Sequence, residues 1–149
     1  MWACRPTAIA AALAVVALSW LGAGRAAREE PDVVVVQHIL IGFEGSVRGK
    51  SSERTKKEAK ALADELLLRA RSGAEDFDAL VQRYTDDRHP GIYKLTNRGA
   101  PRMNGAYPRD DMAGRFGDVA FSLAVGEFGL AEYSATASPY GWHLIKRLE

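Results

Sequence analysis

The spacing of hydrophobic residues changes along the chain, and the first clear pattern begins at residue 33. Residues 33–41 read VVVVQHILI, a nearly continuous β-branched and aliphatic run that is interrupted only by Gln37 and His38. A short run of this kind is typical of a strand that is buried on both faces. We therefore predict a central strand here.

Two amphipathic helices are predicted after this strand. Thr55 is followed three residues later by Glu58, which forms a capping box, and apolar residues then recur at helical spacing until Gly73. Asp76 can cap a second helix. Its inner face consists of Phe77, Leu80, Val81 and Tyr84.

The second half of the chain begins with a long stretch that lacks any sustained period. Residues 85–111 contain several prolines and glycines, and so long an irregular stretch in a compact domain is usually a functional loop. The pattern of residues 111–127 then predicts a short helical turn followed by another helix, which ends at Gly126. Finally, residues 128–133 and 141–148 read FGLAEY and GWHLIKRL, which predicts two strands joined by a polar turn.

The N-terminal part is set apart by its lack of charge. Residues 6–24 read PTAIAAALAVVALSWLGAG between Arg5 and Arg25. This pattern fits a cleaved secretory signal, while an uncleaved membrane anchor remains a second reading and a buried cytosolic helix a weaker third. We expect a signal or anchor over residues 1–27, a linker over 28–32 and a single domain over 33–149. Either favoured reading places the domain outside the cytoplasmic membrane, for example in the periplasm.

Composition narrows the functional classes. The chain has 149 residues and a net charge of +1, with 20 basic and 19 acidic side chains, so it has no electrostatic footprint for nucleic acid. Its only cysteine, Cys4, lies in the N-terminal segment. We therefore expect neither an internal disulfide nor cysteine chemistry in the domain.

Four motifs in a fixed order carry a family resemblance. They read QHILI, SGAEDFDALVQRYTDD, MAGRFGDVAFSLAVGE and SPYGWHLIKRL, and they extend over residues 35–148. In this order they resemble the parvulin family of prolyl isomerases, of the exported bacterial type. The resemblance implies an α+β fold, with a four-stranded antiparallel sheet surrounded by about four helices.

The resemblance also implies a set of polar site residues. A lone histidine in an apolar strand is more often a core residue than a catalyst, but His38 and His143 match the paired histidines of the family. Asp87 falls where the family has an aspartate or a cysteine beside the isomerising bond. No third ligand accompanies the two histidines, so we expect neither a metal nor a cofactor.

Apolar positions complete the implied site. Met112, Phe116 and Phe121 match the residues that receive the proline ring, and Tyr107 ends a stretch that matches the family's Gly-Ala-aromatic sequence. Ala113 departs from the family, because many members have a glutamine there. Phosphate-directed members have a basic residue where this chain has Gly42, which argues against selection of phosphoserine.

The function implied is peptidyl-prolyl cis/trans isomerisation of unfolded or partly folded exported polypeptides. We expect a monomer that twists the X-Pro bond without covalent chemistry. The alternative is a parvulin-shaped chaperone or peptide-binding module that holds extended segments without catalysis.

Overall fold

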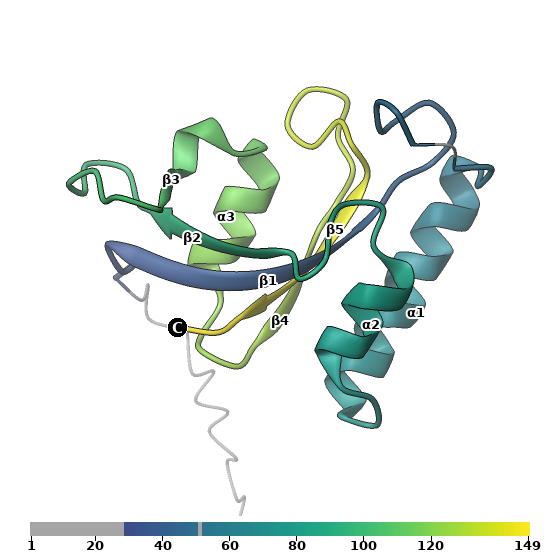
Figure 1. Cartoon of the computed structure of the whole chain (residues 1–149), viewed down its shortest axis with the longest axis horizontal. Coiled ribbons are helices and arrows are strands. Elements are labelled where there is room, and N and C mark those ends of the chain that lie inside the picture. The colour runs from purple at the N-terminus through teal and green to yellow at the C-terminus, as the bar shows by residue number, and fades with distance from the viewer. Residues whose placement is uncertain (1–28, 51) are drawn as a thin grey trace, which may run out of the picture.

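The predicted central strand forms as β1 (Val33–Ile41), and it is almost wholly buried. The computed structural model describes residues 29–50 and 52–149. β1 is the central strand of a mixed sheet in the order β3-β2-β1-β5-β4 (Figure 1). The other strands are β2 (Ile92–Thr96), β3 (Tyr107–Pro108), β4 (Phe128–Ala131) and β5 (Trp142–Arg147).

The predicted helices are confirmed together with their caps. Helix α1 (Lys56–Ser72) begins at the capping box of Thr55 and ends at Gly73, whose φ of 68° is left-handed. Helix α2 (Phe77–Tyr84) begins where the Asp76 carboxylate accepts the backbone N–H of Ala79. Helix α3 is Gly114–Ser122, and a single 3-10 turn, η1 (Arg109–Asp111), precedes it.

The helices cover opposite faces of the sheet (Figure 1). Because side chains alternate along a strand, Ile39 and Leu144 pack against α1 and α2, whereas Val36 and Ile145 pack against α3. His38 lies in phase with Val36 on β1. It therefore faces α3, and the candidate site forms on this face.

The predicted four-stranded antiparallel sheet with about four helices is correct in class and wrong in detail. The described residues form five strands, of which β3 pairs in parallel with β2, and three α-helices with one 3-10 turn. The stretch 85–111 is not wholly irregular, since it contains β2, β3 and η1. Two residues of β3 and one turn of η1 are too short to produce a hydrophobic period.

The predicted export segment, residues 6–24, lies outside the described residues. Within residues 29–50 and 52–149, no helix is long and apolar enough to cross a membrane.

Candidate active site

A cavity of about 310 Å³ opens on the α3 face of the sheet. Strands β1 and β5 form its floor, and the start of α3 forms one wall. The residues that line it are His38, Leu40, Val47, Asp87, Tyr93, Asp111, Met112, Ala113, Phe116, Tyr140 and His143.

The floor carries a row of three polar side chains. His38 Nε2 lies 3.2 Å from Asp87 Oδ2, and His38 Nδ1 lies 3.3 Å from His143 Nδ1. The imidazole rings are stacked, with centroids 5.4 Å apart. Tyr93 donates its hydroxyl to the same Asp87 oxygen at 2.9 Å. The predicted neighbours His38, His143 and Asp87 are thus brought together.

The direction of the hydrogen bonds follows from the carboxylate. Asp87 can only accept, so His38 Nε2 carries a hydrogen and donates it. When His38 is neutral, its Nδ1 accepts from the Nδ1–H of His143. His143 Nε2 is then unprotonated and can only accept a hydrogen bond. This buried atom has no hydrogen-bond partner among the described residues.

Asp87 and His143 are held in different charge states, because hydrogen bonds favour the charged carboxylate and burial favours the neutral imidazole. Hydrogen bonds from His38 and Tyr93 hold the pKa of Asp87 well below its ordinary value, although burial opposes them. Burial, helped by the nearby His38, lowers the pKa of His143 to about 3. The floor at neutral pH therefore contains an ionised Asp87 and a neutral His143.

The segment that carries Asp87 is bound to β1. The backbone N–H of Leu40 donates to Thr85 Oγ1 at 3.1 Å, and the N–H of Asp86 donates to the Leu40 carbonyl at 2.8 Å. Asp86 accepts the N–H of Gly42 at 2.7 Å and also pairs with Arg54. Asp86 is therefore a structural residue, and it directs the next side chain into the cavity.

Gly91 completes this support from the other side. Its carbonyl accepts the backbone N–H of His38 at 3.0 Å. Its φ is 63°, and a Cβ atom there would lie 2.7 Å from the His38 carbonyl oxygen. Glycine is required for this close approach.

The apolar wall comes from α3 and the turn before it. Phe116 is 1% exposed, and its ring meets His38 and His143 edge-on with centroids 5.1 and 5.3 Å away. Met112 and Ala113 line the cavity above it. The opposite rim consists of Val47 and Tyr140, whose loops are joined where Ser46 Oγ donates to the Tyr140 carbonyl at 2.9 Å.

This arrangement suits one kind of chemistry. An apolar wall stands over a polar floor, and none of the cavity-lining residues is a nucleophilic serine, threonine or cysteine. Among residues 29–50 and 52–149, no three His, Cys, Asp or Glu side chains are grouped to hold a metal ion. The cavity can enclose a small apolar ring and place an adjoining polar bond against the histidines.

The sequence pattern of the PPIC-type PPIase domain matches residues 23–149. The chain belongs to this family. The order of the four motifs in the sequence predicted this membership, and the match confirms that the chain carries the domain of a peptidyl-prolyl cis/trans isomerase.

Two solved structures are similar in fold to this PPIC-type domain. The peptidyl-prolyl isomerase ESS1 from Candida albicans is 24% identical with a TM-score of 0.62, and the match covers 79% of this chain and 63% of that protein. TbPIN1 is 20% identical with a TM-score of 0.59, and the match covers 79% of this chain and 98% of that one. The matched region thus spans less than two thirds of ESS1.

Two residues expected at the proline pocket of this PPIC-type domain do not line the cavity. Phe121 follows Phe116 by five residues on α3, which turns it about 140° around the helix axis. It is 2% exposed and packs in the core. Tyr107 lies on β3, is 46% exposed, and packs against Tyr93 with ring centroids 5.7 Å apart.

Several cavity residues were missed by reasoning from the sequence. Tyr93 could have been found, because IYKLT between Gly91 and Asn97 has the β-branched and aromatic composition of a short strand. Val47 and Tyr140 come from loops rich in glycine and serine, where no periodicity marks a site residue. They reach the cavity only through the tertiary fold.

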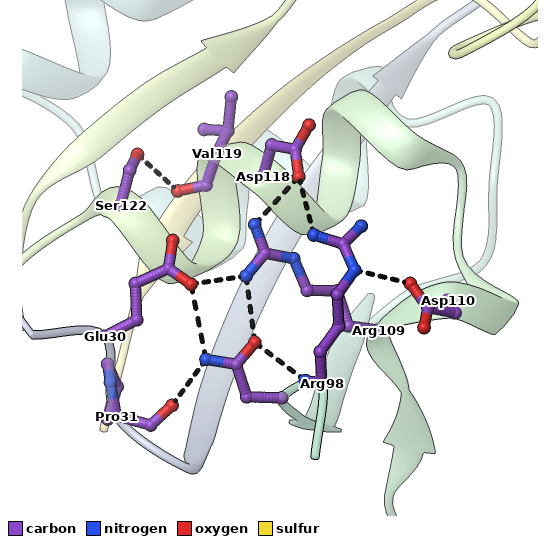
Figure 2. A network of polar contacts seen from close by, with 9 residues as sticks. Glu30, Pro31, Arg98, Arg109, Asp110, Asp118, Val119 and Ser122 are labelled. Carbon is purple, nitrogen blue, oxygen red and sulfur yellow. Dashed lines mark hydrogen bonds and ion pairs between the residues drawn. The ribbon is translucent and has the colours of Figure 1, made fainter. Parts of the chain in front are cut away.

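A buried arginine, Arg109, lies at the centre of a polar network next to α3 (Figure 2). Arg109 is 6% exposed, and its Nη1 donates to Glu30 at 2.5 Å and to Asn97 at 2.9 Å. Its Nη2 donates to Asp118 on α3 at 2.8 Å. The Arg109 carbonyl accepts the N–H of Met112. Glu30, which precedes β1, is therefore joined to the turn from which the pocket wall begins.

Proposed function

We propose that this protein catalyses cis/trans isomerisation of X-Pro bonds in polypeptides, with the proline ring in the 310 Å³ cavity. The observation that carries the proposal is the hydrogen-bonded row of Asp87, His38 and His143, in which both imidazoles lie against the ring of Phe116. Membership of the PPIC-type family supports the same activity.

The chemistry required is rotation, and no covalent bond is broken. The amide C–N bond has partial double-bond character, which gives a barrier of about 18–20 kcal/mol. The planar amide is more polar than the twisted one, so water stabilises the ground state more than the transition state. An enclosed apolar wall removes that water and lowers the barrier.

Each part of the site has a separate task in this mechanism. Met112 and Phe116 contact the proline ring and exclude solvent. His38, His143 and Asp87 hold the floor in one hydrogen-bonded arrangement and set the electrostatic field at the imide carbonyl. About 5 kcal/mol of preferential stabilisation of the twisted state would accelerate rotation several-thousandfold.

We propose that the substrates are unfolded or partly folded exported polypeptides, and that the protein acts as a monomer. The uncharged run of residues 6–24 supports export or a membrane tether, and slow prolyl isomerisation limits the folding of many chains. Mass measurement of the protein recovered from intact cells decides between trimming near residues 24–26 and a tether. A full-length chain soluble in the cytoplasm would contradict export.

The activity is tested by following the cis-to-trans relaxation of an Ala-X-Pro-Phe peptide without a coupled protease. We expect relaxation to accelerate in proportion to enzyme concentration. A protein that binds the peptide but leaves its relaxation rate unchanged would instead be a peptide-binding module of the same fold. The departure at Ala113, which leaves the wall without the glutamine that could hydrogen-bond the substrate, makes this control necessary.

A further inference from the structure

The carboxylate and basic side chains that line the cavity are of one sign. Two of its lining residues, Asp87 and Asp111, are carboxylates, and no lysine or arginine lines it in the described part of the chain. Arg88 follows Asp87, but its guanidinium lies over Tyr93, 5.9 Å from the ring centre, and does not line the cavity.

The two carboxylates differ in what they bind. Asp87 is engaged by His38 and Tyr93, as the floor requires. Asp111 is exposed, and its side chain has no hydrogen-bond or ion-pair partner among residues 29–50 and 52–149. Its neighbour Asp110 instead accepts from Arg98 Nε at 2.7 Å and does not line the cavity (Figure 2).

The cavity is small enough that a bound substrate would feel the charge of its two carboxylates. A sphere of the cavity's volume is about 8 Å across, which is comparable to the Debye length of about 8 Å at physiological ionic strength. If the proline ring fills the cavity as proposed, the residue before it lies at the rim. A cation there is attracted by both carboxylates, whereas an anion is repelled.

We infer that Asp111 is a specificity-determining residue, which makes the enzyme prefer Lys or Arg over Glu or Asp immediately before the proline. This inference rests on the proposed isomerase function. Asp111 is free to act on substrate because nothing in the described chain neutralises it, while the Asp87 carboxylate is committed to the floor.

The test compares kcat/KM for Ala-X-Pro-Phe peptides in which X is Lys, Ala or Glu. We expect wild type to favour Lys over Glu by about fivefold or more at low salt, since each exposed pair changes affinity by up to about fivefold. Asp111→Asn should lower this ratio at least about threefold. Added salt should lower the wild-type ratio as well.

Asp110→Asn is the matched control, because it removes the same charge from the same turn. It should leave the Lys/Glu ratio within about 1.5-fold of wild type, since its carboxylate is paired and outside the cavity. An unchanged ratio in Asp111→Asn, an equal change in Asp110→Asn, or a wild-type preference for Glu would overturn the inference. Melting curves of both variants check that each is folded.

The two proposals fail in different ways. If wild type isomerises all three peptides at equal rates, the function stands and the charge preference is wrong. If it isomerises none of them, the proposed function is wrong. Fluorescence polarisation with labelled peptides of the same sequences then decides the preference by binding, with the same two variants and the same expected ratios.

Discussion

The unpartnered nitrogen of His143 makes the stability of the domain depend on pH. This imidazole is 5% exposed, and its Nε2 has no hydrogen-bond partner in the described chain. Burial lowers its pKa to about 3, from an ordinary value of 6.5. The unfolded chain therefore takes up a proton below pH 6.5 that the folded protein does not. The free energy of unfolding should fall as pH drops from 6.5 towards 3.

The size of the effect follows from proton linkage. Between pH 6.5 and 5, the folded His143 stays neutral while the unfolded one titrates, and each pH unit costs about 1.4 kcal/mol once titration is well advanced. We expect this residue to contribute a loss of about 2 kcal/mol between pH 7.5 and 5. Asp87 does not mask it, because a carboxylate with a lowered folded pKa loses its stabilising contribution only as pH falls below about 4.

Urea unfolding at pH 5, 6, 7 and 8 measures this contribution. The variant His143→Gln should lose most of the pH-dependent decline, whatever its stability at pH 8. His143→Leu serves as a second variant should glutamine not be accommodated. His89→Gln is the control, because His89 is partly exposed and pairs with Asp78 outside the cavity, so its variant should keep the wild-type decline. Parallel curves for wild type and both His143 variants would refute the reasoning.

Three further predictions concern the residues that support or line the site. Gly91→Ala should destabilise the domain by at least about 1–3 kcal/mol in urea unfolding, because its positive φ and the close β1 carbonyl both oppose a Cβ atom. Arg109→Leu should cost about 2–4 kcal/mol in the same assay, whereas Glu30→Gln should cost under about 1 kcal/mol, since the arginine is buried and the glutamate is 41% exposed. In the peptide assay, Met112→Ala should lower kcat/KM about tenfold and more than Asp87→Asn, because desolvation by the wall is the main contribution; the reverse order would favour an electrostatic mechanism.

Much of the fold could be predicted because its signals are local. The capping box at Thr55, the left-handed Gly73 and the cap at Asp76 each require only a few neighbouring residues. The run that forms β1 is apolar on both sides because helices cover both faces of the sheet. The pairing of His38 with His143, in contrast, came from the order of motifs, since 105 residues separate them.

The remainder depends on long-range packing that no local pattern records. Arg109 reads as an ordinary surface residue in the sequence, yet three segments outside its own turn η1 converge on it: the residues before β1, the residue after β2, and α3. Val47 and Tyr140 reach the rim because their loops meet at the ends of β1 and β5. Phe121 is a different case, because its angle of about 140° from Phe116 around the helix axis can be read from the sequence.

The position of the candidate active site is decided by the register of β1 against β5. Leu40 pairs with His143 and His38 with Ile145, so both imidazoles point to α3 while Ile39 points to α1. Because side chains alternate with a period of two, a slip of either strand by one residue would turn its histidine into the apolar layer beneath α1. That slip would bury an imidazole without its partner and expose leucine or isoleucine in the cavity. The hydrophobic pattern that specifies the core therefore also specifies the polar floor of the cavity.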